Sequence, residues 1–357
     1  MVFTSVERNL ECNGPLERSG WRIWLVLCLP TFYYVQMWLR DDFTKNMNID
    51  DHILMENFDD KVNSWNVANL TTVARSNNSD QSLTGLKVWL MDSIGAKPGD
   101  TKIVPHLNIS HDDVKPTNLY PKLKVGGYFA PEECQARHYV AVIVPYRGRH
   151  DNLKIFLYNI HPFLMAQKLQ YQIFIIEQYG NASFNMGRLY NAGYREIQEY
   201  GKWKCVVFHD VDLLPTDRRI LYTCPTYPRH MCAGTLHDPT YRPLFGGVVA
   251  MTPEHYEKAN GYSNLFWGRG GEDDDMFWRL RFTGTTVVRY DKRIAKYWSL
   301  PHNSEPKNER RFEILKTIRD RWKHEGLSSV KYRLMGTTFR HLFTHIVVDI
   351  NPFGDTY

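Results

Sequence analysis

Two groups of closely spaced carboxylates have a sequence context that could support chemistry. Glu272-Asp273-Asp274-Asp275 follows Gly268, Gly270 and Gly271, and Asp210-Val211-Asp212 occurs earlier. Two carboxylates this close repel each other, which raises the pKa of one of them. A divalent cation removes that penalty, and a nucleotide diphosphate supplies its other oxygen ligands. The Asp-x-Asp pair therefore indicates a metal–nucleotide site, although such a pair taken alone is also typical of a turn or a helix cap.

The acidic run lies at the mouth of an expected helix. Met276, Phe277 and Leu280 share one face of a helix that should start near Asp274. The helix dipole favours a carboxylate in the first turn by about 0.3–1 kcal/mol, which explains one or two acidic residues but not four. Because glycine adds backbone freedom at an entropic cost, we interpret the segment as a mobile lid that leads into a general base.

Alternating strands and helices must position these carboxylates. Apolar, Val-rich runs predict buried strands and helically spaced runs predict helices, namely strands over 139–146, 171–176 and 205–208 and helices over 152–170, bent by Pro162, and 185–200. This β-α-β-α-β succession predicts a parallel, right-handed, nucleotide-binding sheet. Ligands bind beyond the carboxyl ends of such strands, and Asp210-Val211-Asp212 ends the third of them. The first strand ends at Arg147 and Arg149, which suit phosphates.

The N-terminal region indicates the cellular compartment of the rest of the chain. The stretch 23–39 holds seventeen residues without a charge between Arg22 and Arg40, the short end for a membrane span. A cleaved signal peptide or a buried helix is the alternative, but no small-residue cleavage site follows. We therefore expect a cytosolic tail (1–22), an uncleaved transmembrane signal-anchor (23–39) and a translocated remainder, which the weak positive-inside bias also favours.

Sequons and cysteines fit an oxidising lumen. The polar stretch 40–115 resembles a glycosylated stem before a catalytic domain over 116–357, and the chain after the anchor carries four Asn-x-Ser/Thr sequons, at Asn69, Asn77, Asn108 and Asn181. Four cysteines also follow the anchor, without zinc-site spacing, at Cys134, Cys205, Cys224 and Cys232. An even number of cysteines on the translocated side favours disulfides.

Composition narrows the class of protein. The 357 residues are 43% hydrophobic and 14% aromatic, so a sizeable core forms and general disorder is excluded. The net charge of +5 is small and the basic residues are scattered, which gives no argument for nucleic-acid binding. A glycoside hydrolase built on the acidic pairs is disfavoured, because it needs no nucleotide site and leaves the two arginines without a role.

Six motifs, in order, resemble the β-1,4-galactosyltransferase family, which is glycosyltransferase family 7. They are VPYRGR (144–149), FN-x-x-x-L-x-N-x-G (184–193), FHDVDL (208–213), FGG (245–247), WG-x-GGEDDD (267–275) and RF (311–312). The likeness runs from about Gly126 to Asp349. It implies an α/β, GT-A-type fold with a Rossmann-like mixed sheet in a single-pass type II Golgi membrane protein. The implied reaction is an inverting attack on a UDP-sugar by the 4-hydroxyl of a terminal N-acetylglucosamine.

The resemblance also implies a role for each matched residue. Asp273 matches the catalytic base, and Asp212 and His302 match metal ligands that usually serve manganese. The donor site is matched by Pro145, Tyr146, Arg147, Arg149, Phe184, Asp210, Val211, Leu244, Gly247, Trp267 and Glu272, and the acceptor site by Asp274, Arg311, Phe312 and Leu315. Ordinary core packing is the alternative for Phe312 and Leu315. Cys205 and Cys224 match a family disulfide, and we hypothesise a second bond between Cys134 and Cys232.

The sequence departs from the family pattern around the diphosphate. Ser299 occupies the position of a third metal ligand, Arg269 replaces the second Trp of the family's WGWGG lid, and Met186 replaces a phosphate-contacting Arg. The segment between His230 and Phe245 offers no match for the family's phosphate-side Lys. These changes raise a second hypothesis, in which the protein is a weakly active relative that binds sugar or assists a partner enzyme. For the active enzyme, a helper membrane protein is a possible partner.

The residue before FGG bears on donor choice. Vertebrate galactosyl enzymes of the family carry a Tyr there, which crowds the 2-acetamido group of a donor. This chain has Leu244, which is smaller and has no hydroxyl. We therefore predict UDP-N-acetylgalactosamine as the preferred donor, with UDP-galactose as the alternative.

Overall fold

The computed structural model describes residues 101–110, 112–114, 119–236, 245–291, 293–352 and 354. The expected anchor, Asn69, Asn77 and Leu244 lie outside these residues. None of the described helices has both the length and the apolarity that a bilayer crossing requires. Asn108 and Asn181 lie within the described part and are exposed, as sequons must be for modification.

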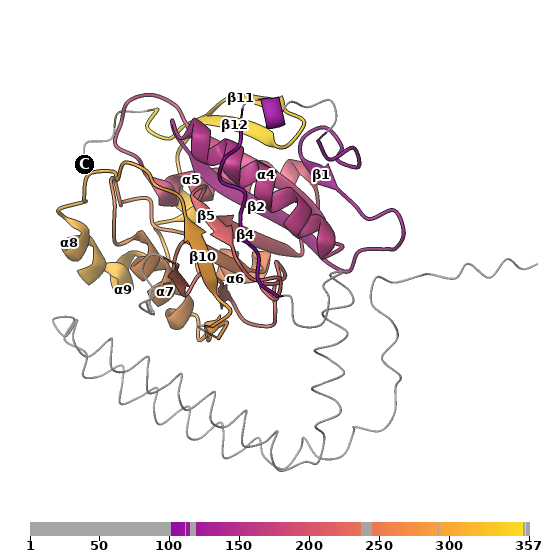
Figure 1. Cartoon of the computed structure of the whole chain (residues 1–357). Coiled ribbons are helices and arrows are strands. Elements are labelled where there is room, and N and C mark those ends of the chain that lie inside the picture. Colours follow the sequence, from indigo (N-terminus) through magenta and orange to yellow (C-terminus); the bar gives the residue numbers. More distant parts are fainter. Residues whose placement is uncertain are drawn as a thin grey trace, which may run out of the picture. The chain divides into compact units, whose positions relative to one another are not determined.

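A mixed sheet forms the centre of the fold. In the described part of the chain nine strands take part, in the order β11-β12-β3-β2-β4-β8-β6-β9 with β1 beside β3, and a second sheet has the order β5-β10-β7 (Figure 1). The strands are β1 (Tyr128–Phe129), β2 (Tyr139–Tyr146), β3 (Gln170–Gln178), β4 (Cys205–His209), β5 (Leu213–Pro215), β6 (Arg229–His230), β7 (Gly234–Thr235), β8 (Val248–Met251), β9 (Val288–Arg289), β10 (Lys296–Ser299), β11 (Arg333–Phe339) and β12 (Thr344–Asp349).

Strand direction follows the expectation in part. β3, β2 and β4 are parallel neighbours, as the β-α-β-α-β pattern predicts. β8 pairs antiparallel with β4, so the whole sheet is mixed, as the resemblance implied, and not purely parallel. The first residue of β8, Val248, lies opposite the last residue of β4, His209, so the chain enters β8 from the end of β4 where the Asp-x-Asp sequence lies.

Helices cover both faces of the sheet. They are α4 (His150–Ala166), α5 (Met186–Ile197), α6 (Pro253–Lys258), α7 (Glu272–Phe282), α8 (Arg311–Lys316) and α9 (Ile318–Arg321), with 3-10 turns at Asp112–Val114, Gln198–Tyr200 and Leu327–Ser329. Because successive side chains of a strand point to opposite faces, Val142 of β2 packs in the cluster with α4 and Ile143 in the cluster with α5. Figure 1 shows α4 lying across one face.

Local sequence explains where these helices begin. The Asn185 side chain accepts a hydrogen bond from the Arg188 N–H at 2.9 Å and caps α5. Pro162 lies inside α4, as predicted. α7 begins at Glu272, earlier than the expected start near Asp274, because Gly271 takes a left-handed φ of 103° and turns the chain into the helix.

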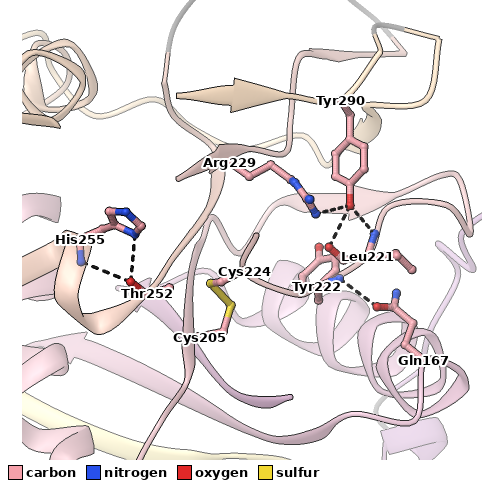
Figure 2. Close-up of a disulfide and its surroundings, with 9 residues drawn as sticks. All are labelled: Gln167, Cys205, Leu221, Tyr222, Cys224, Arg229, Thr252, His255 and Tyr290. Carbon is pink, nitrogen blue, oxygen red and sulfur yellow. Dashed lines mark hydrogen bonds between the residues drawn. A yellow bond between two sulfur atoms is a disulfide. The ribbon is translucent and has the colours of Figure 1, made fainter. Parts of the chain in front are cut away.

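One of the two expected disulfides is present. Cys205 at the start of β4 is bonded to Cys224 across 19 residues (Figure 2). The Tyr290 hydroxyl holds the same loop, since it accepts from the Leu221 N–H at 2.9 Å and from Arg229 at 2.7 Å. The predicted bond between Cys134 and Cys232 is wrong. Cys232 carries a thiol, and its Sγ lies 3.8 Å from the Gly234 carbonyl oxygen to which it donates.

Candidate active site

Asp212 and His302 meet beyond the end of β4. Asp212 is 6% exposed, and its Oδ2 lies 3.1 Å from His302 Nδ1. Arg149 lies on its other side, with Nη1 at 3.4 Å from Oδ1. The second sheet explains the meeting, because β10 pairs with β5 and places Ser299 opposite Leu213. The two predicted metal ligands, distant in sequence, are therefore neighbours in space.

The donor set suits a divalent first-row cation only in part. One carboxylate and one imidazole are ligands that manganese accepts, and a diphosphate offers further oxygens. Ser299 contributes at best a hydroxyl, a weaker ligand. No group of three or more His, Cys, Asp or Glu side chains that could hold a metal exists among the residues described. The pair fits a metal held jointly with a bound nucleotide.

Arg147 links the nucleotide side of the site to the segment after His302. It donates to the Ala182 carbonyl oxygen at 2.6 Å and to the Glu305 carboxylate at 3.1 Å. Its guanidinium lies 5.3 Å from the centre of the Phe184 ring. The Phe184 carbonyl in turn accepts from the Gly268 N–H at 2.7 Å, so the glycine-rich segment is anchored beside the expected donor site.

Asp273 lies directly against Gly246. A Cβ atom built on Gly246 would come within 2.0 Å of Asp273 Oδ2. Asp273 Oδ1 and Glu272 Oε2 are buried and have no hydrogen-bond partner among the described residues. Buried carboxylate oxygens normally have partners, so these two atoms point to a ligand.

Electrostatics connects the two acidic clusters. Burial raises the pKa of Asp273 well above its usual range, and Glu272, Asp210 and Asp274 raise it further. Burial raises the pKa of Glu272 to about 7 and, with the help of Asp212, that of Asp210 to about 8. Since the Asp210 N–H donates to the Gly247 carbonyl oxygen at 2.9 Å, the Gly246–Gly247 turn touches both clusters. Asp210, which interacts with Asp212 and also raises the pKa of Asp273, therefore connects the two acidic clusters.

Asp275 has a different role from its neighbours. It is fully buried and forms ion pairs with Arg279, at 2.5 Å, and with Arg321. Arg279, also fully buried, pairs with Glu325 at 2.6 Å. The four acidic residues therefore have different surroundings. Glu272 and Asp273 have buried oxygens without a partner in the described part of the chain, Asp274 is half-buried beside them, and Asp275 anchors α7 through its ion pairs. Arg279 lies one helical turn from Asp275. The sequence pattern gave no signal for the rest of the network, because Arg321 and Glu325 lie 46 residues from Asp275 and Arg279 respectively.

The predicted acceptor residues separate into surface and core. Phe312 is 46% exposed, with the Arg311 guanidinium 4.3 Å from its ring centre. Leu315 is 8% exposed and packs with Phe266 and Ile318, so the core alternative describes its packing. Arg311 reaches back to the glycine-rich segment, since a Cβ on Gly270 would lie 3.3 Å from its Cδ.

Two residues that sequence reasoning did not single out support the site. Arg188 is buried, places its guanidinium 4.7 Å from the centre of the Trp267 ring and donates to the Ile350 carbonyl oxygen at 2.7 Å. His230 is buried behind the Gly246–Gly247 turn. Of the two, only Arg188 had a signal in the sequence, since it lies within the FN-x-x-x-L-x-N-x-G motif (184–193), and His230 had none. Arg269, in place of the lid Trp, is exposed and donates to the Ser304 hydroxyl at 3.1 Å.

Comparisons with known proteins agree with this geometry. The family described as the N-terminal region of glycosyl transferase group 7 matches residues 93–225, and the N-terminal domain of galactosyltransferase matches residues 234–303. Rattus norvegicus β-1,4-galactosyltransferase 3 is 39% identical over 237 residues, which cover 64% of this chain and 60% of that protein. Cricetulus griseus β-1,4-galactosyltransferase 4 is 39% identical over 257 residues, which cover 70% of this chain and 74% of that protein.

A solved structure supports the fold. The catalytic domain of Drosophila β-1,4-galactosyltransferase 7 in complex with xylobiose is 26% identical, covers 60% of this chain and 94% of its own, and has a TM-score of 0.50. A mutant of the same Drosophila enzyme, with manganese, UDP-Gal and xylobiose, gives the same values. The match spans only 60% of the length of the rat enzyme. With the family sequences and the GT-A-like mixed sheet both present, the chain belongs to the β-1,4-galactosyltransferase family of glycosyltransferase family 7.

Proposed function

We propose that this protein is an inverting, metal-dependent glycosyltransferase. It transfers N-acetylgalactosamine or galactose from a UDP-sugar to the 4-hydroxyl of a terminal N-acetylglucosamine. Membership of the family and a solved relative with manganese, UDP-Gal and a sugar acceptor support the proposal. The observation that carries it is the Asp273 carboxylate, which has a buried oxygen with no partner among the described residues and interacts electrostatically with Asp210 of the Asp-x-Asp pair.

Asp273 is the general base in this proposal. The acceptor 4-oxygen bonds to the anomeric carbon while the bond from that carbon to the diphosphate oxygen breaks, and the electron pair leaves with UDP. The hydroxyl proton passes to Asp273. One base suffices, because a single displacement inverts the centre without a covalent intermediate. The base must be ionised and its pKa is raised, so we expect turnover to increase with pH until Asp273 is fully deprotonated.

The remaining residues bind and orient the donor. Asp212 and His302 would hold the metal, which when bound neutralises the charge of the leaving diphosphate. Arg149, beside Asp212, adds a positive charge. Arg147 and the Phe184 ring form a cation–π pair at the nucleotide side. Glu272, with its buried free oxygen, is placed to accept a hydrogen bond from a sugar hydroxyl.

A transfer assay tests the reaction. The purified full-length chain should join either UDP-sugar to free N-acetylglucosamine only when manganese is present, with a β-1,4 linkage by NMR. The chelator EDTA should abolish turnover and excess manganese should restore it. The second candidate, a sugar-binding or helper subunit, is motivated by Ser299, Arg269 and Met186. UDP binding that shows no linkage to manganese, together with no product, would favour it.

Leu244→Tyr tests the choice of donor. We expect the wild type to prefer UDP-N-acetylgalactosamine, and the variant to lose that preference by roughly 10- to 100-fold in the ratio of kcat/KM values, because a bulky ring crowds the acetamido group. Side-by-side turnover of both donors measures it. Leu334→Tyr, on an exposed part of β11, is the matched control. A strong galactose preference in the wild type that persists in Leu244→Tyr rejects the proposal.

Location forms part of the same proposal. The uncharged stretch 23–39 would anchor the chain in the Golgi membrane as a single-pass type II protein, with the catalytic residues in the lumen. The four sequons after this stretch and the Cys205–Cys224 disulfide are consistent with that orientation.

A further inference from the structure

His230 is a buried polar residue at the rear of the site. It lies in β6 opposite Val249 of β8 and is 1% exposed. Its Nε2 is 3.1 Å from the Gly246 carbonyl oxygen. A carbonyl oxygen only accepts hydrogen bonds, so Nε2 must carry the hydrogen and donate. The other ring nitrogen, Nδ1, then carries a lone pair, and it has no hydrogen-bond partner among the residues that the structure describes.

The Gly246 carbonyl is held from two directions. It accepts the His230 Nε2–H and also the Val248 N–H, the latter at 2.8 Å. The opposite side of Gly246 is in contact with the Asp273 carboxylate, which leaves no room for a Cβ atom. A shift of this turn would therefore be passed directly to the carboxylate. The Gly247 carbonyl, next in the chain, accepts the Asp210 N–H and ties the turn to the Asp-x-Asp segment.

We propose that His230 is a positioning residue, which fixes Asp273 through the Gly246 carbonyl. The inference rests on the proposed role of Asp273 as the base. The hydrogen bond from Nε2 to the Gly246 carbonyl is the contact that a phenyl ring at this position could not make. The backbone of Cys232 also interacts with the imidazole. Burial, aided by the Arg289 charge, lowers the pKa of His230 to about 3, so the ring stays neutral throughout the working range of the enzyme.

Two amide variants separate positioning from folding. The amide nitrogen of Gln falls near the position of imidazole Nε2, whereas that of Asn falls near Nδ1. His230→Gln and His230→Asn are both polar, but only the first can donate to Gly246. We expect His230→Asn to lower kcat by roughly 10- to 100-fold, the loss expected for a misplaced catalytic group, with KM for the UDP-sugar within about threefold. His230→Gln should recover most of that kcat at a similar melting temperature.

His230→Phe and His255→Phe complete the set. His230→Phe keeps a planar ring without a donor and should behave as His230→Asn does. His255, on α6, bonds to the Thr252 hydroxyl, and its replacement should leave kcat unchanged. The inference is overturned if His230→Asn keeps wild-type kcat, or if Gln and Asn lose kcat equally.

Asp273→Asn, assayed alongside, distinguishes a failure of the proposed function from a failure of the inference about His230. If Asp273→Asn is active, Asp273 is not the base and the proposed function is rejected. An inactive Asp273→Asn beside a fully active His230→Asn removes only the inference about His230. If His230→Asn proves too unstable to assay, His230→Phe decides in its place, with His230→Gln as the reference. Loss of kcat with retained UDP binding in His230→Phe, recovered in His230→Gln, supports the inference, and wild-type turnover in His230→Phe contradicts it.

Discussion

Asp273→Asn is expected to lower kcat by about 10²- to 10⁴-fold, the usual contribution of a general base, while binding of the UDP-sugar with manganese is retained. The amide has the shape of the carboxylate but cannot accept the acceptor's proton. Its contact with Gly246 remains available, so the turn is not disturbed. Steady-state kinetics with N-acetylglucosamine and calorimetry of UDP binding measure the two effects separately. Asp320→Asn, an exposed residue of α9, makes the same chemical change away from the site.

The same replacement should make the empty protein more stable near neutral pH. The pKa of Asp273 in the folded state is raised above its value of 3.8 in the unfolded chain. Its favourable contribution to folding is therefore complete below about pH 3.8 and is lost as the pH rises toward the folded-state pKa. Asp273→Asn removes this loss, so its gain in melting temperature should be larger at pH 7 than at pH 4. Unchanged turnover, or a gain independent of pH, would show that Asp273 is not the buried base described here.

Arg279→Met is expected to reduce the free energy of unfolding by about 3–5 kcal/mol, the cost of leaving a buried ion pair without one partner. Arg279 is fully buried, and its removal leaves Asp275 with Arg321 alone and takes the buried partner from Glu325. Denaturant titration followed by circular dichroism measures the change. Arg281→Met, two positions along α7 and exposed, is the matched control and should change stability by less than about 0.5 kcal/mol.

Activity gives a second measure of the network. α7 carries Glu272, Asp273 and Asp275 in its first turn and Arg279 in its last turn. An Arg279→Met protein that remains folded should therefore lose kcat in parallel with stability, because the helix that carries the proposed base has lost its anchor. Equal stability of the Arg279 and Arg281 variants would mean that the network does not hold α7.

The sequence predicted elements whose pattern is local. The Val-rich run over 139–146 is β2, and the capped run after Asn185 is α5, because burial on both sheet faces and helical spacing both leave a periodic signature. The Cys205–Cys224 bond and the meeting of Asp212 with His302 followed only from family resemblance. Nothing in the spacing reports a contact across 19 residues in the first case or across 90 in the second.

Features that depend on distant partners escaped the sequence. The antiparallel entry of β8 depends on register with β4, which a short apolar run does not encode. The sequence pattern assigned Asp275 no structural role, because the network that holds it also needs Arg321 and Glu325, which lie in and after α9. The Cys134–Cys232 pairing was inferred by counting, and counting carries no geometry. Leu315 matched an acceptor position through the family resemblance, and its packing with Phe266 and Ile318 could not be foreseen from the sequence.

The contact between Gly246 and Asp273 restricts how this chain can diverge. Gly247 has a φ of 71° and must be glycine for backbone reasons. Gly246 lies outside that region of φ, so conformation alone would tolerate alanine there, and only the carboxylate forbids it. A lineage that has given up Asp273 loses this constraint. A larger side chain at position 246 in a related sequence would then indicate, without any assay, that position 273 no longer serves as the proposed base.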